Sequence, residues 1–417
     1  MSFVKGLRCK QCGKEYPIQP LYVCDEDFGG LEVVYDYDAV RASLSRETIE
    51  SRPGNVWRYR ELLPVEGRPH TGEHSGWTPL VRADNLAREL GVRELYIKDD
   101  SVNRPSLSYK DRVVSVALSK AIEFGFDTIG CASTGNLANA VASHGARAGL
   151  KRYIFIPADI EPGKILGSLI FDAHIVLVRG NYDDVNRLCA EVGDKFGWAF
   201  VNVNLRPYYT EGAKTHGYEI AEQLGWKFPG SVVLPVAGGT ILPKVARAFE
   251  ELQTLGFVDD ELPRMYAAQA SGCNPVSEAF KTNADSINPK KPDTIAKSIA
   301  IGNPADGYDV LDILRKTGGA ADDASDDEII DAIKLLARTE GLFTEPAGGA
   351  TLAVAKKLIR DGKIDPDQPI VICITGNGYK VREAVEGKAG AGRLIDASLH
   401  SFEDNYSDIL PKQLAEV

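Results

Sequence analysis

Three short segments hold the residues whose types and spacing are suited to chemistry, and each lies next to the start of a predicted helix. The segment RPSLSYKDR (104–112) is a Pro/Ser-rich turn that leads through Lys110 into the helical pattern VVSVALSKAIEF. At a helix N-terminus the backbone dipole disfavours an ammonium, which helps an amine to form a Schiff base with an aldehyde. Taken alone, Lys110 could equally be a surface lysine paired with Asp111.

The other two segments are turns that join a strand to a helix. Ser133, Thr134, Gly135 and Asn136 follow the apolar strand TIGC, and the turn Ala237-Gly238-Gly239-Thr240 follows the strand SVVLPV. Small hydroxyl residues and glycines at such turns direct free N–H groups at an anion. Each turn alone is a weak signal, because most turns of this kind only allow close packing.

Length and composition exclude several classes of protein. The chain has 417 residues, which predicts two or three domains, and its net charge of −11 makes nucleic acid an unexpected partner. No stretch approaches the roughly 18 apolar residues of a membrane span, so no membrane partner is expected. The N-terminal residues do not follow the pattern of a signal peptide, and the seven cysteines are not spaced as a disulfide scaffold. We expect a cytoplasmic protein.

From about residue 78 the chain alternates short apolar strands with helices. Strands are predicted at 95–98, 128–131, 153–157, 174–178, 199–203, 231–236, 265–270 and 370–375, and helices at 110–124, 136–148 and 212–225. Strands this apolar are buried on both faces, which indicates open parallel sheets covered by helices and hence an α/β protein. A capping box, Ser325 to Glu328, begins a further helix that ends at Gly341. The acidic run 322–328 before and inside it is expected to face solvent, and 282–294 is expected to be a long surface loop.

The first 45 residues differ from the rest and predict a small ribbon-like segment. Cys9 and Cys12 form one CxxC knuckle, while the second knuckle has Cys24 followed by Asp27 in the place of the fourth thiolate. Carboxylates do bind zinc, so these four residues are candidate ligands. A ribbon that has lost its metal is the alternative, and both interpretations stay open.

The motifs of several common enzyme classes are absent. The sequence contains no HExxH, no GxSxG, no P-loop and no GxGxxG that follows a strand. Zincin, hydrolase, P-loop and dinucleotide-binding functions therefore lose most of their support.

The order of motifs resembles the fold type II, or β-family, of pyridoxal 5'-phosphate enzymes, and within it the threonine synthases. The segments that carry the likeness are the CxxC-bearing N-terminus, SYKDR, ASTGN, VNVNLRPYYTEGAKT, IGNPADG, EPAGGATLAV and TGNGYK, over residues 5 to 395. The resemblance implies two α/β domains with the site between them, the small one over 105–200 and the large, cofactor-binding one over 46–104 and 201–417. It also implies a homodimer.

By resemblance, Lys110 holds the cofactor and moves protons, while Ala237, Gly238, Gly239 and Thr240 cradle its phosphate. Asn136 is expected at the ring oxygen, and Thr375, after the strand IVICI, at the ring nitrogen. Ser133, Thr134 and Gly135 would receive the carboxylate of the substrate, a small phosphorylated amino acid.

The ligands of the substrate phosphate are less well defined. Asn204 and Arg206 are the candidates, with Lys164 a weaker one. The family pattern has an arginine two residues before the Glu-Gly pair, and here Tyr209 occupies that place. A surface ion pair is the competing explanation for Arg206.

The implied reaction converts O-phospho-L-homoserine and water to L-threonine and phosphate. Two rivals share the fold: a cysteate synthase, which uses phosphoserine and sulfite, and a serine or threonine dehydratase, which needs no distal phosphate site. A third rival is a zinc-dependent binding protein with an inert α/β body.

Overall fold

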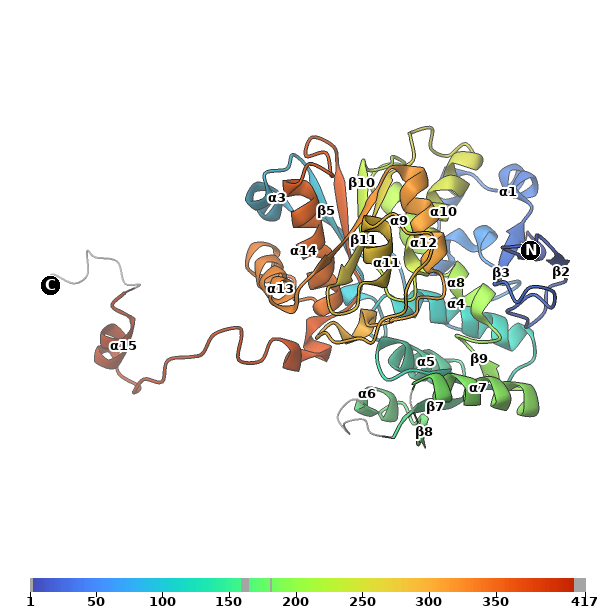
Figure 1. The fold of residues 1–417 in the computed structure, drawn as a ribbon, viewed down its shortest axis with the longest axis horizontal. Helices are drawn as coiled ribbons and strands as arrows, with labels where there is room; N and C mark the ends of the chain where they lie inside the picture. The colour runs from blue at the N-terminus through green and yellow to red at the C-terminus, as the bar shows by residue number, and fades with distance from the viewer. Residues whose placement is uncertain (1–2, 159–164, 181, 409–417) are drawn as a thin grey trace. The chain divides into compact units, whose positions relative to one another are not determined.

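The computed structural model describes residues 3–158, 165–180 and 182–408. Residues up to Val381 form one compact unit, which contains three sheets (Figure 1). Residues from Arg382 onward form a second unit with the short helices η6 (Arg382–Ala384) and α15 (Leu399–Tyr406). Among the described residues, no helix has the length and apolar character that crossing a membrane requires.

The largest sheet has six strands in the order β12-β11-β10-β13-β5-β4. Its strands are β4 (Leu80–Arg82), β5 (Leu95–Asp99), β10 (Ser231–Pro235), β11 (Arg264–Ala270), β12 (Ala320–Ala324) and β13 (Ile370–Ile374). All neighbours are parallel except β4, which pairs antiparallel with β5 at the edge. Every residue of β10 and β13 is buried, as expected for apolar strands that are covered on both faces.

The second sheet has four parallel strands in the order β8-β7-β6-β9. They are β6 (Thr128–Ala132), β7 (Lys151–Pro157), β8 (His174–Val178) and β9 (Ala199–Phe200). Helices α5 (Asn136–Arg147) and α7 (Tyr182–Phe196) both contact β6 and β7 (Figure 1). All four strands lie within residues 105–200, and the division of the chain into domains stays a prediction.

The N-terminal residues form a three-stranded antiparallel sheet, β2-β1-β3, which we call the ribbon. Its strands are β1 (Val4–Cys9), β2 (Glu15–Tyr16) and β3 (Leu31–Tyr35). β3 contacts α8 (Arg206–Glu211), and the Tyr208 hydroxyl of α8 donates to the Gln19 carbonyl oxygen at 2.7 Å. The ribbon is thus attached directly to one helix of the main body.

The remaining helices connect and cover the strands. They are α1 (Tyr37–Ser43), α2 (Arg46–Glu50), α3 (Asp84–Leu90), α4 (Lys110–Glu123), α6 (Leu166–Leu169), α9 (Lys214–Gln223), α10 (Ile241–Thr254), α11 (Pro275–Lys281), α12 (Gly307–Thr317), α13 (Asp326–Glu340) and α14 (Pro346–Arg360), with the 3-10 helices η1 (Val56–Leu62), η2 (Asp100–Val102), η4 (Lys297–Ile299) and η5 (Gly378–Lys380). α14 packs against β10, β11, β12 and β13. The capping box at Ser325 and the left-handed C-cap at Gly341 of α13 are confirmed.

Three predicted elements differ from the structure. The strand predicted at 199–203 ends at Phe200, because the chain turns over 201–205. The helix predicted at 212–225 is α9, which begins at Lys214 and is preceded by the separate α8. The start of the acidic run is only partly exposed: Asp323 lies in β12, where its carboxylate accepts hydrogen bonds from Ser271, Asn274 and Ser277.

A buried group of charges holds the start of α4 in place. The Arg112 guanidinium donates from Nε to Asp100 Oδ2 at 2.6 Å and from Nη2 to Glu219 Oε2 at 2.8 Å. Lys98 Nζ lies 2.7 Å from the same Glu219 oxygen, and all four side chains are fully buried. Burial acts to raise the pKa of Glu219, but the charges of Arg112 and Lys98 lower it to about 2. Two cations and two anions therefore neutralise one another between β5, η2, α4 and α9.

We expect Arg112→Met to lower the free energy of unfolding by about 3–5 kcal/mol, because it leaves two carboxylates buried without their partner. Urea unfolding followed by tryptophan fluorescence measures this loss. Arg338→Met is the matched control: its ion pair with Glu89 is largely exposed, and its loss should change the free energy by less than about 1 kcal/mol. Equal effects of the two substitutions would contradict the prediction.

Candidate active site

Lys110 is the first residue of α4, and the segment before it is attached to the end of β13. Tyr109 N–H donates to the Thr375 carbonyl oxygen at 2.8 Å, and Ser108 forms an antiparallel bridge with Gly376. Asp111 is fully buried; its Oδ2 accepts the N–H of Ser106 at 3.0 Å, and its Oδ1 lies 3.2 Å from His144 Nε2. The alternative of a surface lysine paired with Asp111 therefore does not apply. Lys110 is half-buried, and its Nζ donates to the Tyr209 hydroxyl at 3.0 Å.

Thr375 follows the last residue of β13 at the carboxyl end of the six-stranded sheet. The residue is only 9% exposed. Within the described part of the chain its hydroxyl makes no hydrogen bond, although its carbonyl oxygen accepts from Tyr109. A hydroxyl without a protein partner at this edge of the sheet is available to a ligand atom.

The turn of Ser133, Thr134 and Gly135 joins the end of β6 to α5. Gly135 is the N-cap of α5, so Asn136 is its first residue, and no side chain caps this helix end. The Ser133 hydroxyl accepts the Gly135 N–H at 3.4 Å. Free amides at a helix N-terminus favour an anion, as the sequence indicated.

The Asn136 amide lies between two charged residues that the sequence did not single out. Its Nδ2 donates to Glu345 Oε2 at 3.0 Å, and its Oδ1 accepts from Lys380 Nζ at 2.7 Å. Both residues are in motifs of the family resemblance, EPAGG and TGNGYK, but nothing in their spacing shows that they meet Asn136. Burial raises the pKa of the Glu345 carboxyl and lowers the pKa of the Lys380 ammonium. Both groups are thus shifted towards their neutral forms.

The turn from Ala237 to Thr240 leads from β10 into α10 and is closed from one side by Asp306. Gly239 has φ +93°, and a Cβ there would lie 2.7 Å from the Asp306 backbone, so only glycine suits this position. Thr240 Oγ1 donates to Asp306 Oδ2 at 2.8 Å. Among the described residues, no hydrogen bond is donated by the amides of Gly238, Gly239 and Thr240. These amides form a cradle that fits a phosphate.

Helix α8 links this cradle to Lys110. Arg206 and Tyr209 are one turn apart and share a face of the helix. The Arg206 guanidinium donates to Asp306 Oδ2 at 2.7 Å, beside Thr240, while Tyr209 contacts Lys110. The reactive amine and the cradle therefore lie near opposite ends of one short helix.

One candidate ligand of the substrate phosphate, Asn204, does not join this group. Asn204 Oδ1 accepts the Phe200 N–H at 2.8 Å and Nδ2 donates to the Trp198 carbonyl oxygen at 3.0 Å, so its side chain closes the turn after β9. This placement argues against the predicted role of Asn204. Lys164 lies outside the described residues.

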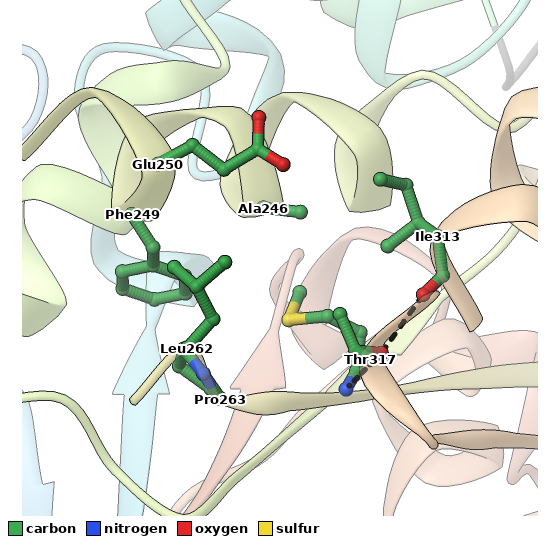
Figure 2. A pocket seen from close by; sticks show the side chains of 8 residues that line it. Ala246, Phe249, Glu250, Leu262, Pro263, Ile313 and Thr317 are labelled. Atoms are coloured by element: carbon green, nitrogen blue, oxygen red, sulfur yellow. Dashed lines mark hydrogen bonds between the residues drawn. The ribbon is translucent and has the colours of Figure 1, made fainter. Parts of the chain in front are cut away.

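The small pocket in Figure 2 is separate from these residues. It lies between α10, β11 and α12, with Phe249, Leu262 and Ile313 in its wall. Its volume is about 10 Å³, no more than one water needs. It cannot hold a substrate.

The fold and the site together fit a pyridoxal phosphate enzyme. The residues present provide an amine, a phosphate cradle, an amide and an unpartnered hydroxyl, which are the groups that such a cofactor contacts. The family model described as pyridoxal-phosphate dependent enzyme matches residues 72–376.

Similar proteins of known function indicate which pyridoxal phosphate enzymes this chain is related to. The chain is 39% identical to the threonine synthase of Methanocaldococcus jannaschii, over 90% of this chain and 93% of that protein. It is 37% identical to the threonine synthase of Methanosarcina acetivorans, over 95% and 98%. The chain belongs to the threonine synthase family of pyridoxal phosphate-dependent enzymes.

Solved structures support the fold alone. Diaminopropionate ammonia lyase from Escherichia coli superposes with a TM-score of 0.64 at 18% identity, over 83% of this chain and 94% of that one. Threonine deaminase isoform 2 from Solanum lycopersicum gives a TM-score of 0.63 at 23% identity, over 74% and 82%.

We expect Glu345→Ala to weaken the binding of pyridoxal phosphate about fivefold to a hundredfold, because it leaves the half-buried Asn136 amide without its acceptor. Titration of the cofactor-free protein, followed by absorbance, measures the dissociation constant. Glu278→Ala, an exposed glutamate, is the control and should leave it unchanged. A change below twofold in Glu345→Ala would show that Glu345 does not support Asn136.

Proposed function

We propose that this chain converts O-phospho-L-homoserine and water to L-threonine and phosphate. The observation that carries the proposal is the match to threonine synthases over nearly the whole length of both chains. Lys110, the cradle and Asn136, which that activity would require, lie at helix N-termini in the same compact unit.

Six residues would hold the cofactor. Lys110 would bind its aldehyde, the amides of Gly238, Gly239 and Thr240 its phosphate, Asn136 its ring oxygen and Thr375 its ring nitrogen. Bound pyridoxal phosphate supplies an electron-withdrawing group that makes protons of an attached amino acid removable. A neutral hydroxyl at Thr375 would limit how much charge the ring withdraws, which suits elimination and replacement.

Lys110 would move the protons of the reaction. Its amine would take a proton from Cα of the substrate and then one from Cβ, after which phosphate leaves from Cγ. A proton would then be delivered to Cγ, water would add its hydroxyl at Cβ, and a proton would return to Cα, so that the protons balance and threonine and phosphate are the products. The Tyr209 hydroxyl, 3.0 Å from Lys110 Nζ, would hold the amine in position through these transfers.

The two anionic groups of the substrate need separate donors. The turn of Ser133, Thr134 and Gly135 would bind the carboxylate at the start of α5. Arg206 is our candidate for the substrate phosphate, and its partner Asp306 would then have to share the guanidinium with the ligand.

Two further properties are proposals of the same kind. The substrate is a small molecule, and we propose that the enzyme works as a homodimer in the cytoplasm. The free thiols of all seven cysteines agree with a reducing compartment.

Product analysis tests the function directly. The purified protein, loaded with pyridoxal phosphate, should release threonine and phosphate in equal amounts from O-phospho-L-homoserine. Consumption of phosphoserine and sulfite without any threonine would instead identify a cysteate synthase. Release of a keto acid and ammonia from free serine or threonine, as the main activity, would identify a dehydratase.

We expect Lys110→Ala to abolish turnover and the visible absorption band of the bound cofactor, and Tyr209→Phe to lower kcat while keeping the band. Loss of a group that transfers protons costs about 10²–10⁴-fold in rate. The decrease in kcat of Tyr209→Phe should be about 10²-fold or smaller, because Tyr209 only positions the amine. Steady-state kinetics with visible spectra measure both variants. Full activity in Lys110→Ala would refute the site.

A further inference from the structure

The ribbon contains a group of four side chains whose ligand atoms converge. Cys9, Cys12, Cys24 and Asp27 each offer one ligand atom, and these atoms all lie within 4.8 Å of one another. Cys12 Sγ is 3.7 Å from Cys24 Sγ, and Cys9 Sγ is 3.3 Å from Asp27 Oδ1. In a tetrahedral zinc site with Zn–S bonds of about 2.3 Å, two sulfurs are separated by about 3.8 Å. The spacing therefore matches a single ion at the centre of the four.

The backbone around the cluster is arranged for thiolates. Gln11 N–H donates to Cys9 Sγ and Glu26 N–H donates to Cys24 Sγ, each at 3.4 Å. In both knuckles, the sulfur of the first residue thus accepts a hydrogen bond from the backbone amide two residues later. The Tyr16 hydroxyl lies 3.0 Å from Cys24 Sγ. Such donors stabilise the charge of a coordinating sulfur and orient it.

The cluster also requires a glycine beside it. A Cβ on Gly29 would lie 2.8 Å from Cys9 Sγ and 2.9 Å from Asp27 Oδ1. The Gly29 N–H donates to Asp27 Oδ1 at 2.8 Å, which fixes the carboxylate towards the sulfurs. The aspartate in the second knuckle is thus held in a ligand position and has not turned away.

The first knuckle carries a lysine that reaches the cofactor cradle. Lys10, between Cys9 and Cys12, extends its Nζ to 2.5 Å from Asp309 Oδ2 and 3.5 Å from Asp306 Oδ1. Asp306 is the residue that accepts from Thr240 and pairs with Arg206. Lys10 therefore balances part of the negative charge of Asp306. Without Lys10, Asp306 would hold Arg206 more tightly beside the cradle.

We propose that Cys9, Cys12, Cys24 and Asp27 bind one Zn²⁺ ion, and that this ion fixes Lys10 against Asp306 at the edge of the cofactor cradle. A closed tetrahedral set rich in thiolates is typical of structural zinc, and a carboxylate oxygen is among the ligands that zinc accepts in the fourth place. The part that concerns Lys10 rests on the proposed function, since it takes the turn from Gly238 to Thr240 as the phosphate site.

Metal analysis of the purified full chain tests the zinc site without any assay of activity. Mass spectrometry of the elements should find about one zinc per chain, and the cobalt-substituted protein should show the intense visible bands of tetrahedral thiolate coordination. Cys12→Ala should lose the metal, Cys273→Ala, a cysteine outside the ribbon, should keep it, and Asp27→Cys should also keep it. Wild-type protein without zinc and without the cobalt bands, or with iron in its place, would overturn the assignment.

The coupling to the cradle has its own test. Removing zinc with a chelator should raise the dissociation constant of pyridoxal phosphate about two- to fivefold, the range that a partly exposed ion pair gives. Lys10→Ala should keep its zinc, show the same rise, and show no further rise on chelation. A chelation effect of equal size in Lys10→Ala would overturn the role of Lys10. Zinc content and cofactor affinity do not depend on which substrate is used, so a failure here is distinct from a failure of the proposed reaction.

Discussion

The interaction on which the site depends is the buried charge group around Arg112. Arg112 lies two residues after Lys110, and its guanidinium is fixed by Asp100 and Glu219 with no exposed surface on any of the three. A buried charge is tolerated only when it is paired and hydrogen-bonded, so the start of α4 has one low-energy position between β5 and α9. Burial also acts to lower the pKa of His216 beside Asp100, which keeps the group neutral overall. The position of the Lys110 amine follows from this constraint.

The site is formed by the N-terminal ends of helices as much as by side chains. Lys110, Asn136 and the turn that ends at Thr240 each lie where a helix begins, and the positive end of a helix dipole favours negative charge. A cofactor with a phosphate and a substrate with a carboxylate and a phosphate are suited to such a surface. The charged side chains that do reach it are paired within the protein: Lys380 and Glu345 with Asn136, Arg206 and Lys10 with Asp306. Ligand binding would therefore exchange internal partners for external ones.

Helix α8 connects the ribbon with the turn from Gly238 to Thr240 and with Lys110. Helix α8 contacts the ribbon through Tyr208, the cradle through Arg206 and the amine through Tyr209. The helix therefore contacts three parts of the protein that are far apart in the sequence: the ribbon, Asp306 beside the cradle, and Lys110. A small ribbon has little core of its own, and a metal is a usual means to stabilise such a segment. Because Lys10 lies inside the first knuckle, an ordered ribbon would also fix the position of Lys10 at Asp306.

The sequence by itself determined the class of fold and most strands of the two larger sheets, and it singled out the three segments that begin helices α4, α5 and α10. Runs such as IVICI and TIGC are too apolar for an exposed strand, and Ser325, Glu328 and Gly341 specify the ends of α13 through local hydrogen bonds. What depends on contacts between distant segments could not be predicted. The pairing of Asn136 with Glu345 and Lys380 and the ion pair of Lys10 with Asp306 join residues up to 296 positions apart. Only the tertiary structure decided them, because local periodicity carries no information about which distant side chain will satisfy a buried polar group.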